Sequence, residues 1–160
     1  MKTDNETVYE KARPQDASIL TEIRQEVIQI VWKTEPGTDL SAYYDNTLAY
    51  FSKALADENH TAFLAYNGNE LIGCGGISYY DVMPTYGNPS GRQGLIMNMY
   101  VSPDFRRRGI ARNILKMLIQ DALEKGVTYI TLEATETGKL FYKKCGFKKD
   151  DDAMVYRNDR

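Results

Sequence analysis

The sequence has 160 residues, a length that suits one domain with a hydrophobic core of its own. Its 20 lysines and arginines nearly balance its 22 aspartates and glutamates, which argues against a broad basic surface for binding nucleic acid. Two cysteines that lie far apart and a single histidine lack the spacing of a zinc site, so we expect reduced thiols and no metal.

The N-terminal part of the chain predicts one strand and two helices. Its first 15 residues, MKTDNETVYEKARPQ, hold no apolar run that could act as a signal peptide or membrane span, so we expect a cytoplasmic protein without membrane association. A strand over Thr7–Ala12 precedes a helix whose predicted N-cap is Asp16, and a second helix follows Pro36–Gly37. The apolar residues at helical spacing are Ile19, Ile23, Val27, Ile30 and Val31 in the first helix, and Leu40, Tyr44, Leu48, Phe51 and Leu55 in the second.

The middle of the chain predicts three strands. Apolar runs over Thr61–Tyr66 and Leu71–Tyr80 flank Asn67–Gly68, a pair typical of tight hairpin turns. Residues 81–94 are rich in proline, glycine and asparagine and therefore predict a long loop. The next strand, Leu95–Val101, is apolar on both faces, which places it in the centre of a sheet.

The C-terminal third alternates helical and strand-like patterns. The predicted elements are a helix over Gly109–Lys125 closed by Gly126, a strand over Thr128–Ala134, a short helix over Thr137–Lys144, a strand from Phe147 and a last strand over Ala153–Tyr156. The order strand, helix, strand implies a right-handed crossover and parallel pairing of the two strands. Without repeats or signs of a second domain, we expect a fold of the α/β (α+β) class, a mixed sheet with helices on both faces.

A cluster of arginines stands at the start of the third helix, in the stretch SPDFRRRGIARNIL. A helix start already carries unpaired N–H groups and partial positive charge, so added cations repel one another unless an anion binds there. Gly109 lets a ligand approach the backbone, Ala111 keeps the first turn uncrowded, and the amides of residues 107–112 can form a concavity that binds a phosphate. The other interpretation is a solvated basic turn. The arginines are Arg106, Arg107, Arg108 and Arg112.

The pattern Arg-x-x-Gly-x-Ala, between an apolar strand and an amphipathic helix, resembles the acyl-CoA site of the GNAT superfamily of N-acetyltransferases. That family carries Gln/Arg-x-x-Gly-x-Gly/Ala between its fourth strand and third helix. The stretch LEATETGKLFYKKCGF is similar to the family's fifth strand, short helix and Tyr-x-x-x-Gly-Phe segment, with Tyr142, Gly146 and Phe147 in place. The resemblance covers Leu95–Phe147. Thr135 stands where many members have asparagine, and the loop into the last helix is shorter than in the branch that acetylates ribosomal proteins and protein N termini.

The resemblance implies a single acyl-CoA N-acyltransferase domain over residues 1–160 and a mostly antiparallel sheet of six to seven strands. The fourth and fifth strands of such a sheet splay apart, and the pantetheine arm of acetyl-CoA lies in the gap. A bulge in the fourth strand frees backbone groups that pair with the arm and polarise the thioester carbonyl. The implied cofactor contacts are Met99, Tyr100, Val101, Arg106, Arg107, Arg108, Gly109, Ile110, Ala111, Arg112 and Thr135.

Proton transfer then needs a base and an acid. Glu133, in the fifth predicted strand among apolar neighbours, is the first candidate for the base that deprotonates the amine, and Asp81 is the second. Tyr142 is the candidate acid that protonates the departing CoA thiolate. The other interpretations are that Glu133 is an ordinary charged residue at the sheet rim and that Tyr142 only packs its ring.

The resulting hypothesis is an N-acetyltransferase that moves the acetyl group of acetyl-CoA directly to a primary amine of a small molecule or peptide. Trp32, Tyr80 and Asp81 are candidates for contact with the amine substrate. Other hypotheses are a protein or N-terminal amine acetyltransferase and a non-catalytic sensor of acyl-CoA. A nucleic-acid-binding role ranks third, because positive charge is concentrated at one turn. The resemblance is also compatible with a homodimer.

Overall fold

The computed structural model describes residues 6–150 and 152–158, which leaves 1–5, 151 and 159–160 of the predicted domain outside the described residues. Its centre is a five-stranded sheet in which the strands follow one another in space as they do in the sequence. The strands are β1 (Thr7–Lys11), β2 (His60–Asn67), β3 (Glu70–Asp81), β4 (Arg92–Val101) and β5 (Ile130–Leu132). The first four pair antiparallel and β5 pairs parallel to β4, which confirms a mixed, mostly antiparallel sheet.

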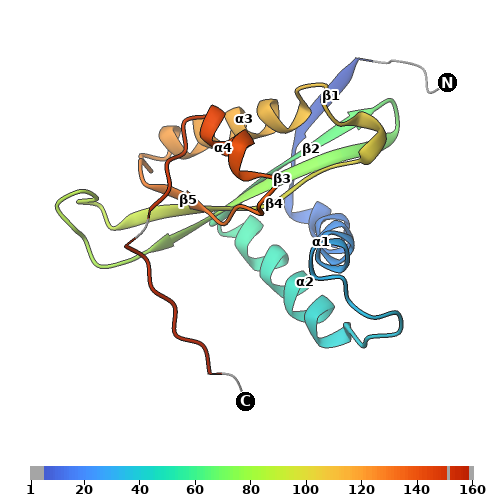
Figure 1. Ribbon diagram of the computed structural model, residues 1–160, viewed down its shortest axis with the longest axis horizontal. Coiled ribbons are helices and arrows are strands. Elements are labelled where there is room, and N and C mark those ends of the chain that lie inside the picture. The colour runs from blue at the N-terminus through green and yellow to red at the C-terminus, as the bar shows by residue number, and fades with distance from the viewer. Residues whose placement is uncertain (1–5, 151, 159–160) are drawn as a thin grey trace.

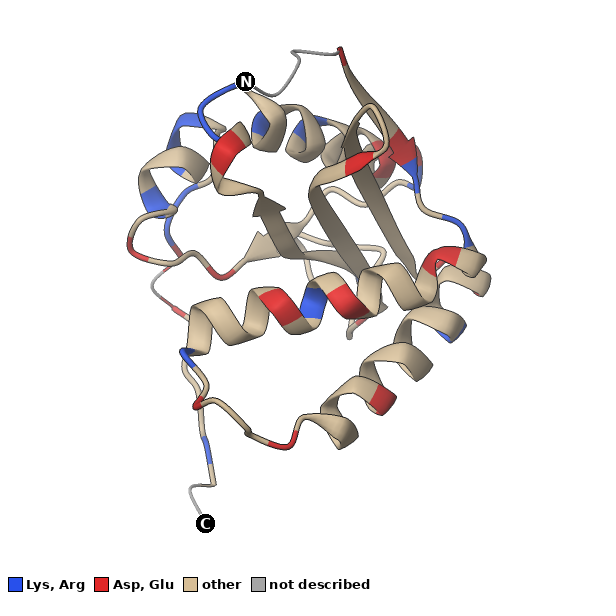
Figure 2. Cartoon of the chain, turned by 90° about the vertical axis from the view of Figure 1, so that its right-hand side faces the viewer, with Lys and Arg blue, Asp and Glu red and all other residues tan. Residues whose placement is uncertain are grey.

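Helices cover both faces of the sheet, as predicted (Figure 1). One face carries α1 (Ala17–Trp32) and α2 (Ser41–Ala56), and the other carries α3 (Ile110–Glu124) and α4 (Lys139–Lys144). The view in Figure 2 shows the same layers from the side, with the sheet between the helices. In the part of the chain that the structure describes, no helix is both long enough and apolar enough to cross a membrane.

Each face of the sheet has its own hydrophobic core. The amphipathic patterns of α1, α2 and α3 turn their apolar sides toward the strands, and each fully buried aliphatic side chain contributes roughly 1.5–3 kcal/mol. The core under α3 includes Ile110, Ile114, Leu115 and Leu118 with Ile77 and Ile96 of the sheet. The core under α1 and α2 includes Leu20, Ile23, Val27, Phe51 and Leu55 with Leu64 and Cys74.

The prediction of strands after the short helix is wrong. The described residues form a sheet of five strands, not the expected six to seven. In residues 145–150 and 152–158 the structure has no strand, and Met154, Val155 and Tyr156 are exposed. The sheet ends instead at β5, which offers an edge of only three residues. The charged run KKDDD at 148–152 is costly to bury against so short an edge.

Several predicted boundaries also shift. The strand predicted to begin at Leu95 begins at Arg92, because the ladder between β3 and β4 continues to the pair of Arg92 with Asp81. The middle strand of the sheet is β3, not β4. Asp16 precedes α1 but makes no capping bond to it, since its carboxylate accepts a hydrogen bond from the backbone N–H of Arg13 at 2.7 Å.

Candidate functional site

Strands β4 and β5 separate part-way along β4. Their pairing ends at Ile96 with Leu132, where β5 stops, while β4 runs on to Val101. Beyond Ile96, the side of β4 that would face β5 therefore has no neighbouring strand within the described residues. The two strands thus part along β4, as the family resemblance implies.

A bulge distorts β4 just beyond the point of separation. The register of β3 against β4 shifts between Cys74 and Gly76, so that Asn98 and Met99 both lie opposite Gly75. Asn98 has a φ of 59°, in the left-handed region that asparagine tolerates better than most residues. The extra residue bends β4 and frees backbone groups from the ladder.

The ladder with β3 shows which backbone groups of β4 face the gap. The N–H of Ser102 donates to the carbonyl oxygen of Ile72 at 2.8 Å, so Ser102 and, by alternation, Tyr100 turn their backbone groups toward β3. Met99 and Val101 consequently turn theirs away from β3, toward the gap. Met99 and the N–H of Val101, both among the predicted cofactor contacts, thus present free strand backbone where a ligand amide could pair with it, while the Val101 carbonyl already accepts a hydrogen bond from Arg106.

The turn before α3 leaves a row of backbone amides without acceptors inside the helix. Arg107 and Gly109 both have positive φ, 64° and 79°. The first helical hydrogen bond runs from the N–H of Asn113 to the carbonyl of Gly109 at 3.0 Å. The amides of residues 109–112 therefore have no acceptor within the helix, and they lie at its positive end. Alternation of left-handed and ordinary backbone around such amides is typical of anion-binding turns.

The side chains of this turn divide into anchored and exposed groups. The Nε of Arg106 donates to the carbonyl oxygen of Val101 at 3.0 Å, which ties the turn to the end of β4. The guanidinium of Arg108 donates to a backbone carbonyl of the preceding turn at 3.3 Å. Arg107 and Arg112 are exposed beside the amides. Ile110 is buried in the core and Ala111 is half-buried, so these two can meet a ligand through their backbone.

Tyr142 lies on α4, on the side of the sheet where Met99 also packs. Its half-buried ring stands edge-on between Phe141 and Phe147, with centroids 5.0 and 5.9 Å away. Its hydroxyl has no hydrogen-bond partner among the described residues. Burial, and secondarily the neighbouring Cys145, raises the pKa of Tyr142. The phenol is therefore protonated at neutral pH and has a proton to donate.

Glu133 and Thr135 follow β5. The expectation that Glu133 lies among apolar neighbours is wrong, because β5 ends one residue earlier and the Glu133 side chain is exposed. The hydroxyl of Thr135 accepts a hydrogen bond from the N–H of Gly138 at 3.2 Å, and its carbonyl accepts from the N–H of Lys139 at 3.1 Å. Thr135 therefore shapes the turn that begins α4.

The candidates for substrate contact are not brought together at the bulge. Asp81 forms an ion pair with Arg92 at 3.2 Å, and Tyr80 pairs with Gln93, so both stand at the beginning of β4, whereas the bulge lies near its end. Trp32 is the last residue of α1 and is 68% exposed. Tyr80 and Asp81 therefore lie at the opposite end of β4 from the bulge.

The sequence analysis did not identify two polar clusters, each with a buried residue at its centre, and the first surrounds His60. Its Nδ1 lies 3.1 Å from the hydroxyl of Tyr50 and 3.2 Å from that of Ser78, and these two hydroxyls are 2.6 Å apart. Burial lowers the pKa of His60 to about 4, so the imidazole is neutral at neutral pH. Only tertiary structure brings α2, β2 and β3 together here, so no local pattern could have revealed it.

The second cluster surrounds Asp121 of α3, whose carboxylate is buried. It accepts hydrogen bonds from Lys11 at 2.7 Å, Tyr79 at 2.7 Å and Thr61 at 2.8 Å, and it pairs with Lys125 at 3.3 Å. Burial would raise the pKa of Asp121, but these hydrogen bonds and the charge of Lys11 outweigh it and lower the pKa to about 2. The carboxylate is thus an ionised tie between α3 and the sheet.

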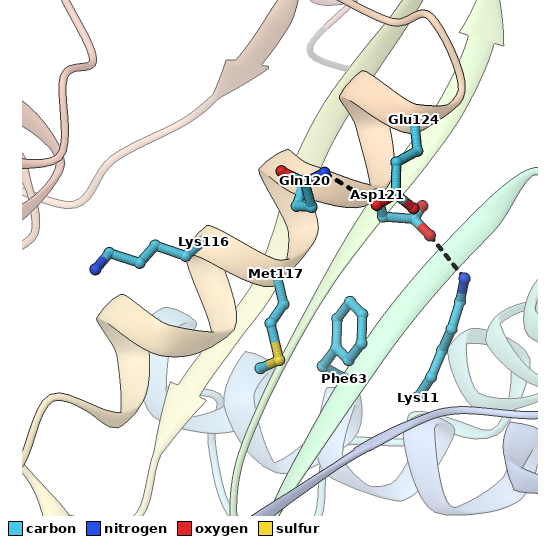
Figure 3. Close-up of a pocket in the computed structure, with 7 residues that line it drawn as sticks. All are labelled: Lys11, Phe63, Lys116, Met117, Gln120, Asp121 and Glu124. Carbon is cyan, nitrogen blue, oxygen red and sulfur yellow. Dashed lines mark hydrogen bonds and ion pairs between the residues drawn. The ribbon is translucent and has the colours of Figure 1, made fainter.

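An open groove of about 510 Å³ lies beside this tie, between α3 and the first two strands (Figure 3). Its lining residues are Lys11, Phe63, Lys116, Met117, Gln120, Asp121 and Glu124. Two lysines and two carboxylates line it, and Asp121 already has its full set of partners. None of the predicted site residues lines this groove.

The sequence is similar to a protein-family model and to curated proteins that carry the name N-acetyltransferase. The sequence model of the acetyltransferase (GNAT) family matches residues 24–147. An uncharacterized N-acetyltransferase of Bacillus subtilis strain 168, YsnE, is 28% identical over 104 residues, which are 62% of this chain and 63% of that protein. N-acetyltransferase 8F1 of Rattus norvegicus is 26% identical over 106 residues, 64% of this chain and 46% of that protein. The chain thus spans less than two thirds of the length of these curated relatives.

Solved structures match over nearly the whole chain. A predicted acetyltransferase from Clostridium acetobutylicum, crystallised with acetyl-CoA, superposes with a TM-score of 0.86 and 34% identity, covering 95% of this chain and 96% of that one. A GCN5-related N-acetyltransferase from Ralstonia eutropha JMP134 superposes with a TM-score of 0.81 and 21% identity, covering 95% and 99%. The second match concerns the fold alone.

Proposed function

The chain belongs to the acetyltransferase (GNAT) family, and from this premise we propose that it transfers the acetyl group of acetyl-CoA directly to a primary amine. The substrate class that we favour is a small molecule, because the short loop into α4 departs from the branch that acetylates protein termini. A peptide amine is the wider alternative. The similar Clostridium protein, crystallised with acetyl-CoA, supports the choice of cosubstrate.

The observation that carries this proposal is the continuity between the gap and the amides at the start of α3. Acetyl-CoA joins a diphosphate to an arm that contains amide groups. The unpaired amides of residues 109–112 suit the diphosphate, and the free backbone of Met99 with the N–H of Val101 suits the arm. The bond from Arg106 to Val101 holds the two parts of the site together.

The substrate amine must lose its proton before it can attack. For a lysine-like amine, supplying the neutral form at pH 7 costs roughly 4.6 kcal/mol, whereas an α-amine costs about 1 kcal/mol. We assign Glu133 as the base that takes a proton from the amine, directly or through water. The Glu133 side chain is exposed, so water can reach it. Its surroundings are not apolar and so do not strengthen it as a base.

Acyl transfer then exchanges one bond for another. The amine nitrogen bonds to the acetyl carbon, the bond from that carbon to sulfur breaks, and the electron pair leaves with the sulfur. Backbone N–H groups at the bulge of β4 stabilise the oxygen that becomes negative on the way. Tyr142 gives its phenolic proton to the thiolate, the nitrogen releases its surplus proton to water, and Tyr142 regains a proton from that solvent. The proposed reaction requires no metal ion.

A non-catalytic sensor of acyl-CoA would use the same binding elements, so turnover is the measurement that distinguishes an N-acetyltransferase from a sensor. The experiment incubates the protein with acetyl-CoA and a panel of spermidine, tyramine, glucosamine, kanamycin and an alanine-initiated peptide, and measures free thiol. We expect thiol release that depends on one or more of the small amines, with an acetylated product of matching mass. Calorimetric binding of acetyl-CoA without thiol release from any amine would identify a sensor instead.

A further inference from the structure

Asn98 combines two unfavourable features at the bulge of β4. Its backbone has a φ of 59°, a left-handed conformation that costs free energy in any residue other than glycine. The residue is only 8% exposed, and its Oδ1 is buried without a hydrogen-bond partner among the described residues. A buried carbonyl without a donor is rare in folded proteins and calls for an explanation.

The surroundings of Asn98 do not supply the missing donor. Its neighbours in β4 are Met97 and Met99, and Gly75 lies opposite. The thiol of Cys74 lies close but donates to the backbone carbonyl of Asn98, at 3.2 Å, and not to the side chain. A bound molecule that carries an N–H group would complete the site.

The position of Asn98 indicates which part of the ligands it meets. The proposed diphosphate site lies just past the end of β4, so an arm bound in the gap would run back along the strand from Val101 toward the bulge. With a strand rise of about 3.3 Å per residue, Asn98 stands roughly 10 Å from Val101 along this path. The amide groups of the arm meet the strand first, and the thioester with its attacking amine lies at the far end.

We propose that Oδ1 of Asn98 accepts a hydrogen bond from the substrate amine and thereby aims the nitrogen lone pair at the thioester carbonyl. This inference rests on the proposed acetyltransferase function and deepens it. A neutral primary amine has two N–H groups: one is held by Asn98 and the other supplies the proton that leaves. A secondary amine has a single N–H and cannot do both. Asn98 is thus a specificity-determining residue that selects primary amines.

The test replaces Asn98 by glycine, which adopts positive φ without strain and removes the side-chain oxygen. The matched control is Glu58→Gly, because Glu58 also has a left-handed backbone (φ 56°) but lies in the connection between α2 and β2. For Asn98→Gly we expect kcat/KM for the best primary amine of the panel to fall about 10-fold or more. The Kd for acetyl-CoA is expected to change less than about 2-fold, and Glu58→Gly to match the wild type in both.

A second measurement needs no variant. We expect the wild type to acetylate tyramine with a kcat/KM at least about 10-fold above that for N-methyltyramine, and equal values would overturn the selection of primary amines. Asn98→Gly with wild-type kcat/KM would overturn the role of Asn98 while leaving the proposed function standing. A rise of the acetyl-CoA Kd with unchanged selectivity would assign Oδ1 to the cofactor instead. If the wild type acetylates no amine of the panel, the proposed function fails, and this inference fails with it.

Discussion

Met99 occupies the space that a side chain at position 75 would need. A Cβ atom built on Gly75 would overlap Sδ of Met99 and lie 2.6 Å from Cγ2 of Ile114 in α3. Gly75 stands opposite the bulge of β4, so its missing side chain lets Met99 and α3 settle against the sheet where the gap opens. One glycine thus serves both core packing and the shape of the candidate site.

Gly75→Ala is therefore expected to lower the free energy of unfolding by about 1–3 kcal/mol, as overpacked core substitutions do. Because Met99 must move, acetyl-CoA is also expected to bind more weakly. Gly87→Ala is the control, since a Cβ at Gly87 meets nothing within 4 Å and should change stability by less than about 0.5 kcal/mol. Urea denaturation of both variants measures the difference. Equal stability would show that the Met99 side chain moves away from position 75 without a cost in free energy.

Gly109 and Gly126 provide a matched pair at the two ends of α3. Their φ angles are 79° and 74°, and a Cβ at either position meets nothing within 4 Å. Valine at either site should therefore cost a similar 1–3 kcal/mol or so in backbone strain. Only Gly109 belongs to the row of amides at the start of the helix, so Gly109→Val is expected to raise the Kd for acetyl-CoA at least about 10-fold. If calorimetry finds the same Kd for both variants, the diphosphate does not bind at the start of α3.

The sequence was sufficient for the features that depend on local patterns. Helical spacing of apolar residues predicts α1, α2 and α3, and the Asn67–Gly68 pair predicts the turn between β2 and β3. The cluster of arginines and Gly109 likewise predicts exposed amides, because helix starts behave alike in any fold. Strand pairing at the C-terminus failed because Ala153–Tyr156 has a suitable pattern but β5 offers an edge of only three residues, and the length of an edge is a property of the whole sheet.

Burial and register limited the prediction of the site. Glu133 follows apolar residues in the sequence, yet it lies past the end of β5 and is exposed. Asp81 sits at the end of a strand, but its partner Arg92 lies across a hairpin, far along β4 from the bulge. Asn98 could have been noticed as the polar residue in LIMNMYV, but its lack of a hydrogen-bond donor is visible only once β3 is paired beside it.

Tyr142→Phe tests the acid of the proposed reaction. Removing the hydroxyl leaves the ring contacts with Phe141 and Phe147 in place, so the fold should be unaffected. Turnover is expected to fall about 10- to 1000-fold, because the thiolate must then leave without a proton from the protein. Acetyl-CoA affinity should change little. Steady-state kinetics and calorimetry on the same preparation measure the two, and full activity of the variant would limit Tyr142 to packing.

His60 makes the stability of the protein depend on pH. Burial lowers its pKa from 6.5 to about 4, so between these values the unfolded chain binds a proton that the folded protein does not. The free energy of unfolding must then fall as the pH falls, by about 2 kcal/mol between pH 7 and pH 5. Asp121 behaves differently: its pKa is lowered from 3.8 to about 2, so its contribution is lost only at more acidic pH.

His60→Asn isolates this effect, because asparagine can still bond to the hydroxyls of Tyr50 and Ser78 but does not titrate. Urea denaturation of the wild type and the variant at pH 7 and pH 5 gives four free energies, and their double difference removes the contributions of carboxylates common to both proteins. We expect this double difference to be about 2 kcal/mol, the contribution assigned to His60. An undiminished pH dependence in the variant would mean that the imidazole takes up its proton in the folded protein and that the cluster is open to water.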